Sequence, residues 1–371
     1  MLLPFVLLAG LAPGAPGAPG APGDALHACV LAELDSFTDW LRREDARGFV
    51  GETGWPDDEM GDADEWNGLA EAWFDRADGD GLWVTTWATG EWWGDSYPLA
   101  PYEDRGEAPG VDTANTQAPV VEAHPGPGRG VNVAGGEFGD APTTQPASSF
   151  SNENAGIYDT DYHYDPQGTF DYLAGRGVRL IRLPFRWERL QREPFGPLHA
   201  AELSRYRGAV GRANEAGLRV VIDPHNFGAY YLSNGEEGVR RAIGSHQVPV
   251  SAFANLWRRL SRAFEDTPGV AGYGLMTEPV ELPERPTGAK LWERASRAAL
   301  DTIRNRGDHT LILVPGYEWS GAQVWADVHP RGWVDDRRFR YEAHHYWDED
   351  HSGTYRSSYA DEVAAAEERG C

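Results

Sequence analysis

The stretch RGFVGETGWPDD, residues 47–58, contains the clearest link between local structure and chemistry in this chain. Residues 48–52 are small or apolar up to Glu52 and have the length of a short buried strand. Glu52 stands where this strand runs into a Gly-Trp-Pro loop, whose residues end regular structure. The stretch therefore predicts a carboxylate at the C-terminal end of a strand, where α/β proteins place groups that act on ligands.

Seven further runs of this kind follow, at 82–87, 130–135, 178–183, 218–223, 273–278, 310–314 and 340–345. Amphipathic segments that predict helices separate most of the runs, at 26–46, 64–77, 166–175, 200–216, 251–266, 289–306 and 357–369. In the segment 251–266 the apolar residues share one stripe of the predicted helix. Eight buried strands alternating with helices predict an α/β fold with a parallel sheet, most simply a closed (β/α)8 barrel.

Composition narrows the possible partners. The 371 residues are enough for one large α/β barrel. The 58 acidic and 33 basic residues give a net charge of -25, which disfavours nucleic acids and anionic membranes because both need a basic surface. The 15 Trp and 15 Tyr suit sugar rings as well as protein cores.

The first residues, MLLPFVLLAGLA, form an apolar run that is too short to span a bilayer. An Ala-Pro-Gly repeat follows and cannot pack. Residues 1–25 are therefore interpreted as a secretory signal and a linker, although the usual basic start is missing. A wrongly assigned start codon would explain the same pattern. We favour export, which predicts an extracellular protein.

Polar and aromatic residues gather where the predicted strands end: Glu52, Trp87, Arg182, His225, Asn226, Glu278, His344 and Tyr346. Each alone has an ordinary explanation, because arginines form surface ion pairs and histidines or tryptophans pack in cores. Together, at the same end of six strands, they favour a functional site. Two carboxylates facing each other across a barrel mouth suit glycoside hydrolysis, in which one protonates the leaving oxygen and the other attacks or activates water.

The motifs around these residues resemble family five of the glycoside hydrolases, the cellulase-like retaining enzymes of clan A. GYGLMTEP (272–279) is similar to the acid/base motif of that family, and GFVGETG (48–54) is similar to its nucleophile strand. The other strand regions of the family resemble RGVNVAGGEFG (129–139), RLPFRWE (182–188), DPHN (223–226), VPGYEWSGAQVW (314–325), YEAHHYWDEDHSGTY (341–355) and TTWATGEWWGDSYPL (85–99).

The resemblance implies roles for individual residues. Glu52 corresponds to the nucleophile and Glu278 to the acid/base, and no metal or organic cofactor is implied. Arg182 and Tyr346 would keep Glu52 ionised. His225, Asn226 and His344 would shape the sugar site. Trp87 would stack on a sugar, and Trp92 or Trp93 would extend the groove. The run HHYWDEDH (344–351) fits no standard set of metal ligands.

One position departs from the family pattern. The family has an asparagine before the acid/base, and this chain has Thr277. The asparagine contacts the 2-hydroxyl of the sugar at the cleaved bond, a contact that strengthens in the transition state. We expect Thr277 to be a weaker sugar contact or to serve a different sugar.

The order of the motifs predicts a circular permutant in which strands seven and eight come first. Residues 26–371 would form one barrel, with 26–102 as the C-terminal part of the family and 129–371 as the N-terminal part. The interval 101–129 is rich in Pro, Gly and Ala and lacks a helical period, so residues 103–128 are interpreted as a linker between the old termini. Opening the chain at an exposed helix or loop costs the fold little stability.

The predicted function is retaining hydrolysis of β-1,4-linked glucan, as in an endo-β-1,4-glucanase, by a monomer. The same chemistry on mannan or xyloglucan is the alternative, and a silent carbohydrate-binding barrel is a third possibility because of Thr277. Two cysteines are too few for a disulfide framework or a structural zinc site. If the chain is a permutant, Cys29 and Cys371 lie near its new termini and could form a disulfide.

Overall fold

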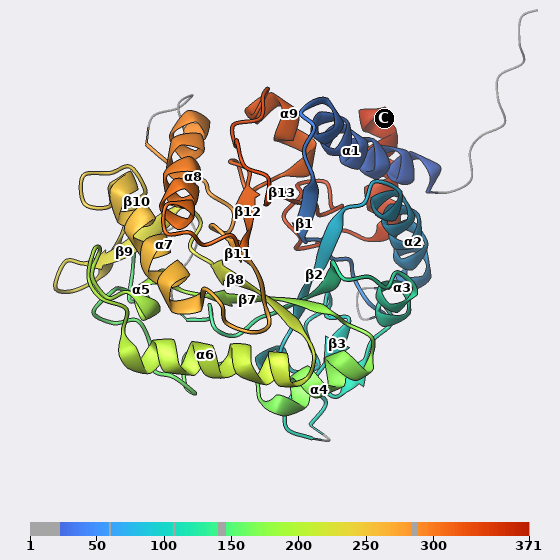
Figure 1. The fold of residues 1–371 in the computed structure, drawn as a ribbon. Helices are drawn as coiled ribbons and strands as arrows, with labels where there is room; N and C mark the ends of the chain where they lie inside the picture. Colours follow the sequence, from blue (N-terminus) through green and yellow to red (C-terminus); the bar gives the residue numbers. More distant parts are fainter. Residues whose placement is uncertain (1–22, 59–60, 107, 140–145, 284–287, 371) are drawn as a thin grey trace, which may run out of the picture.

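The computed structural model describes residues 23–58, 61–106, 108–139, 146–283 and 288–370. Eight strands of this described part form a closed barrel in which every neighbouring pair is parallel (Figure 1). In order around the barrel they are β1 (Gly48–Glu52), β13 (Phe339–His344), β12 (Leu311–Pro315), β11 (Val270–Gly274), β8 (Arg219–Pro224), β7 (Leu180–Phe185), β5 (Arg129–Val133) and β2 (Trp83–Thr89). The predicted (β/α)8 barrel is confirmed.

Helices surround the barrel. They are α1 (Asp24–Arg43), α2 (Ala63–Gly79), α3 (Ala118–Ala123), α4 (Gln167–Gly175), α5 (Trp187–Leu190), α6 (Ala200–Glu215), α7 (Val250–Phe264), α8 (Gly288–Arg304), α9 (Trp325–Val328) and α10 (Tyr359–Arg369), with 3-10 turns η1 (Glu91–Trp93) and η2 (Ala322–Val324). The predicted stripe of α7 is buried, at Phe253, Leu256, Trp257, Leu260 and Phe264. None of the described helices combines the length and the apolar character needed to cross a membrane.

The interior of the barrel changes from apolar to charged along the strands. One layer consists of Phe49, Leu180, Val221 and Leu313, all fully buried. Side chains two residues apart on a strand point to the same face. Arg182 and Asp223 therefore follow Leu180 and Val221 inside the barrel, one step nearer the C-terminal ends of the strands. This step places a charged layer directly beneath the barrel mouth.

The two ends of the described chain meet between β13 and β1. Helix α10 begins with a capping box formed by Ser358 and Asp361 and packs against α1, next to the C-terminus in Figure 1. The Sγ atom of Cys29 lies 3.9 Å from the carbonyl oxygen of Ala366 in α10. Cys371 lies outside the described residues, as does most of the segment 1–25. The disulfide and the signal segment therefore stay predictions.

Three details differ from the sequence prediction. The interval 101–129 is not an unstructured linker, because it contains β3 (Tyr102–Glu103), β4 (Thr113–Ala114) and α3, and its apolar residues Tyr102 and Val111 reach the core. Strand β11 ends at Gly274, so Glu278 lies beyond the strand and not on it. The hairpin of β9 (Ala229–Ser233) and β10 (Gly238–Ala242) pairs with β6 (Ala147–Ser148) in a small sheet that the sequence pattern did not predict.

Candidate active site

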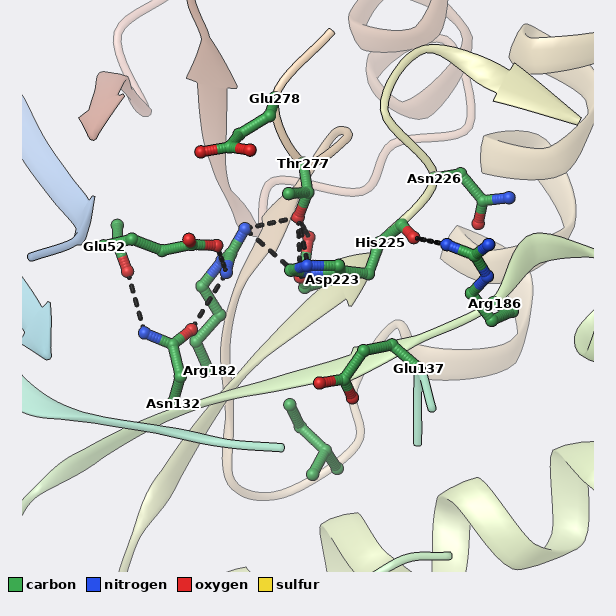
Figure 2. A network of polar contacts seen from close by, with 12 residues as sticks. Glu52, Asn132, Glu137, Arg182, Arg186, Asp223, His225, Asn226, Thr277 and Glu278 are labelled. Atoms are coloured by element: carbon green, nitrogen blue, oxygen red, sulfur yellow. Dashed lines mark hydrogen bonds and ion pairs between the residues drawn. The ribbon is translucent and has the colours of Figure 1, made fainter. Parts of the chain in front are cut away.

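Arg182 is the centre of the charged layer. Its side chain is fully buried on β7, and its guanidinium faces three carboxylates from three other strands. The nitrogen–oxygen distances are 2.7 Å to Glu52, 3.2 Å to Asp223 and 3.4 Å to Glu342. A buried cation with several buried carboxylates is stable only while all the partners are kept, because each lost partner leaves a charge without compensation. Figure 2 shows Arg182 with its partners Glu52 and Asp223.

Glu52 ends β1 and receives its contacts from three directions. Arg182 Nη1 donates to Oε1 at 2.7 Å, the hydroxyl of Tyr346 donates to Oε2 at 3.1 Å, and Nδ1 of His344 lies 3.5 Å from Oε2. Burial alone would raise the pKa of Glu52, but the charges of His344 and Arg182 outweigh it and lower the pKa below its usual value. Arg182 and Tyr346, which were predicted to keep Glu52 ionised, both contact its carboxyl group, and that role stays a prediction.

Glu278 lies after β11 with a backbone φ of 43°, in the left-handed region that residues other than glycine rarely adopt. Nδ1 of His344 lies 2.7 Å from its Oε1. Burial raises the pKa of Glu278, and the nearby charge of Glu52 adds to the increase against the lowering effect of the His344 hydrogen bond. One carboxyl oxygen of Glu52, one of Glu278 and one ring nitrogen of His344 all lie within 4.8 Å of one another.

His344 connects the two carboxyl groups. Burial would lower the pKa of this imidazole, but the charge of Glu52 and the hydrogen bond to Glu278 raise the pKa to about 10. The three groups form a compact set that could hold a metal ion. A proton on His344 opposes metal binding, because a histidine ligand must be neutral. The expectation of a reaction without a metal stays a prediction.

The chemistry that such a pair permits follows from the opposite pKa shifts. A carboxylate with a lowered pKa can act as a nucleophile, and a carboxyl group with a raised pKa keeps a proton to donate. Carboxyl groups that are about 5–5.5 Å apart suit the retaining route of glycoside hydrolysis, whereas the inverting route needs room for a water molecule between them. The short separation of Glu52 and Glu278 fits the retaining route.

Aromatic residues from β2 and its loop line the mouth beside Glu52. Trp87 stacks on His225 with ring centroids 5.1 Å apart. Trp93 stacks on Tyr97 at 4.0 Å and meets Phe138 edge-on. Trp92 is 36% exposed and lies parallel to His163 at 5.0 Å, which leaves an open indole surface at the rim.

Two residues that were predicted to contact the sugar bond to buried protein partners. The amide nitrogen of Asn226 donates to the carboxylate of Glu188, at 2.8 and 3.1 Å from its two oxygens, and the amide oxygen accepts from the backbone N–H of Trp187, so the side chain orders its own loop. The hydroxyl of Thr277 is fully buried and turns into the charged layer. Its Oγ1 lies 2.5 Å from Arg182 Nη2 and 2.9 Å from Asp223 and from Nδ1 of His225.

Several residues of the site were not predicted from the sequence. Asp223 and Glu342 lie two residues before the predicted His225 and His344, and Asn132 accepts from Arg182 Nη1 at 2.9 Å. The period of two residues along β8 and β13 was the available signal, because it puts each of these acids on the same face as the predicted histidine. Glu137, Tyr97 and Trp319 lie within motifs that resemble the family, but the sequence pattern did not single out any of the three.

A cavity of about 640 Å³ opens beside Glu278. It is lined by Glu278, Trp319, His344 and Tyr346 and by residues of the loops after β12 and β13. Trp319 is 37% exposed, so its ring offers a flat apolar face there. The cavity therefore reaches Glu278 and His344 and has an exposed aromatic ring in its wall.

Comparisons with known proteins agree with this geometry. The model of the family Cellulase (glycosyl hydrolase family 5) matches residues 140–369. Endo-beta-1,4-glucanase B of Aspergillus niger is 30% identical over 229 residues, which are 61% of this chain and 60% of that protein. The manganese dependent endoglucanase Eg5A of Phanerodontia chrysosporium is 28% identical over 67% of this chain and 60% of its own length. The chain thus spans about 60% of the length of the curated relatives that it matches.

Solved structures give the same picture. The endoglucanase Cel5A of Pseudomonas stutzeri in complex with cellobiose is 36% identical, with a TM-score of 0.51 over 60% of this chain and 61% of that one. An endo-beta-1,4-glucanase of Xanthomonas axonopodis pv. citri is 33% identical, with a TM-score of 0.52 over 64% and 72% of the two chains. Strands β1 and β2, which carry Glu52 and Trp87, precede the segment that the family model matches.

Proposed function

This chain belongs to the cellulase family, glycosyl hydrolase family 5, and from that premise we propose that it is a retaining endo-β-1,4-glucanase. The observation that carries the proposal is the pair Glu52 and Glu278, whose carboxyl oxygens lie within 4.8 Å and whose pKa values are shifted in opposite directions. A binding protein would need neither the short distance nor the opposite shifts.

The proposed reaction proceeds in two displacements. Glu52 attacks the anomeric carbon while Glu278 gives its proton to the glycosidic oxygen, which leaves with the aglycone. A covalent glycosyl ester on Glu52 remains. Glu278, now a carboxylate, takes a proton from water as the water attacks the same carbon and releases Glu52. His344, which lies between the two carboxyl groups, balances their charge through both steps.

A β-1,4-glucan is the substrate that the observations favour. Relatives of this chain are named endo-β-1,4-glucanases, and one similar structure was solved with cellobiose. The aromatic residues on both sides of the carboxyl pair offer flat apolar faces to pyranose rings. Mannan and xyloglucan present the same kind of faces, so they are the alternative substrates.

The test is the release of reducing ends from a panel of soluble polysaccharides by the full chain and by Glu278→Ala. We expect carboxymethylcellulose or mixed-linkage glucan to be hydrolysed fastest and the variant to be nearly inactive. Preferred hydrolysis of mannan or xyloglucan would reassign the substrate. Equal rates for the wild type and Glu278→Ala, or no release from any polymer, would contradict the proposal.

We also propose that the order of the barrel is a circular permutation of the family order. The family model matches a segment that starts after β1 and β2. A comparison that follows the chain in order cannot match these two strands if they come last in the family and first in this chain. The packing of α10 on α1 supports a break in the helical layer that joins β13 to β1. Export and a monomeric state complete the proposal. N-terminal sequencing of the mature protein and its mass in solution test them.

A further inference from the structure

His163 lies apart from the carboxyl pair, in the segment between β6 and α4, and has no part in the two displacements. Its buried ring stacks on Trp92, with ring centroids 5.0 Å and planes 7° apart. Its Nε2 lies 3.1 Å from Oε2 of Glu91 and 3.2 Å from Oδ1 of Asp165, and its Nδ1 lies 3.7 Å from Oδ1 of Asp159. The imidazole therefore has a carboxylate beside each nitrogen and an indole against one face.

The charges around this ring are unequal. In the described part of the chain, His163 is the only basic side chain within 4.0 Å of these three carboxylates. Arg212 of α6 donates to backbone carbonyl oxygens beside them and not to a carboxylate, and Asp104 adds another negative charge near Glu91. A neutral ring would leave the carboxylates to repel one another without a counter-charge.

The carboxylates favour a proton on the ring. Burial alone would lower the pKa of His163, but Asp165 and the charges of Glu91 and Asp159 outweigh burial and raise the pKa above its usual value. A raised pKa means that the contact contributes its full stability below the pKa of an unfolded histidine, about 6.5, and loses it as the pH rises through the raised value.

The turn η1, which begins with Glu91, depends on this contact. None of its residues is buried, and it is bounded by Gly90 with a φ of 149° and Gly94 with a φ of 64°, conformations that glycine permits. The backbone N–H of Glu91 donates to Oδ2 of Asp165 at 3.0 Å, and the hydroxyl of Thr169 in α4 donates to the same oxygen at 2.8 Å. Polar contacts to a fixed Asp165, more than burial, hold the turn.

The contact connects two neighbouring parts of the barrel, because η1 follows β2 and His163 lies in the connection that leads from β5 to α4. We propose that His163 is a positioning residue that holds the η1 turn and its exposed Trp92 in place while the imidazole carries a proton, and releases them when the proton is lost. The inference rests on the proposed function only in its consequence for substrate binding, since Trp92 stands at the rim.

The first test is independent of activity and follows the fluorescence of Trp92 between about pH 5 and pH 10. The emission of Trp92 is the difference between each protein and the same protein with Trp92→Phe. A protonated imidazole against an indole quenches its emission, so the wild-type emission should rise in one step with a midpoint above about pH 6.5. His163→Gln should show no step. His246→Gln, which changes an exposed histidine before α7, is the matched control and should titrate like the wild type.

The second test compares KM for a soluble glucan at several pH values. At about pH 5.5 we expect KM of His163→Gln to be about three- to tenfold above the wild-type value, as when one contact of this strength is lost, with kcat within about twofold. The two KM values should converge above the midpoint of the fluorescence step. Comparing both proteins at one pH cancels the titration of Glu52 and Glu278.

A wild-type emission without a step, or a ratio of KM values that is the same at every pH, would overturn the inference, because a merely structural role does not depend on the proton. If His163→Gln fails to fold, Glu91→Gln decides. This variant removes one of the three charges, so it should move the fluorescence step to lower pH, and an unmoved step would count against the inference. If the chain hydrolyses no polysaccharide but the step is present, only the proposed function falls.

Discussion

Replacing Thr277 by valine separates a structural role from a sugar contact. Valine has the shape of threonine without the hydroxyl, so the change removes only the hydrogen bonds of Oγ1. Oγ1 accepts from Arg182 Nη2 at 2.5 Å, donates to Asp223 at 2.9 Å and lies 2.9 Å from His225 Nδ1. The three partners keep contacts with one another, because Arg182 Nη2 lies 3.2 Å from Asp223 and His225 Nδ1 lies 3.0 Å from it.

The size of the effect follows from these contacts. One hydrogen bond to a charged group contributes about 1.5–3 kcal/mol, and two that share partners contribute less than their sum. We expect Thr277→Val to lower the free energy of unfolding by about 2–3 kcal/mol. KM should stay within about twofold of the wild-type value, because the hydroxyl faces away from the cleft.

The assay combines urea unfolding, followed by the fluorescence of the 15 tryptophans, with initial rates on a soluble glucan. Thr277→Ser is the control, since it keeps the hydroxyl and loses one methyl group at a cost of about 1 kcal/mol. A large rise in KM with unchanged stability would refute this account and restore the sugar contact that the sequence suggested. Unchanged stability and unchanged kinetics would show that the hydrogen bonds around Oγ1 are not formed.

Three other predictions concern charge, chain order and the termini. Activity should fall at low pH because Glu52, whose pKa is lowered, takes up a proton there, and at high pH because Glu278, whose pKa is raised, loses its proton. If the fall of activity at high pH persists in Glu278→Ala, Glu278 is not the acid. The family order can be restored in a rearranged chain that starts at residue 129, joins residue 371 to residue 24 through a short Gly/Ser linker and ends at residue 128. We expect this chain to fold to the same barrel, with activity within a few-fold of the wild-type activity. A chain that stays unfolded would count against the permutation. Thiol titration of the unfolded, unreduced protein should detect no free thiol if Cys29 and Cys371 pair, and two free thiols would exclude the disulfide.

The fold could be predicted from the sequence because each barrel strand is a short buried run between amphipathic helices. The strand-end positions of Glu52, Arg182 and His344 followed from the same pattern. Side-chain direction could not be predicted. Thr277 and Asn226 lie where the motifs put them, but their polar groups turn to buried partners that come from distant strands and loops.

Glu137 and the segment 101–129 illustrate two other limits. Glu137 reaches the mouth because two glycines and Arg189 shape its loop, and Arg189 is more than fifty residues away in sequence. The short elements β3, β4 and α3 form where no periodic pattern exists, since a few apolar side chains such as Tyr102 and Val111 find the core. In both places the structure depends on contacts between segments that are distant in sequence, and a local sequence pattern carries no information on such contacts.

The most direct test of the central claim is to trap the covalent intermediate. A 2-deoxy-2-fluoro-cellobioside with a dinitrophenyl leaving group slows the second displacement, so the glycosyl ester accumulates. We predict that one fluorocellobiosyl unit attaches to the full chain and that peptide mass spectrometry locates it on Glu52, with no labelling of Glu52→Gln. Labelling of another residue, or hydrolysis of cellulose oligomers without any labelled enzyme and with the α-anomer as first product, would contradict the account.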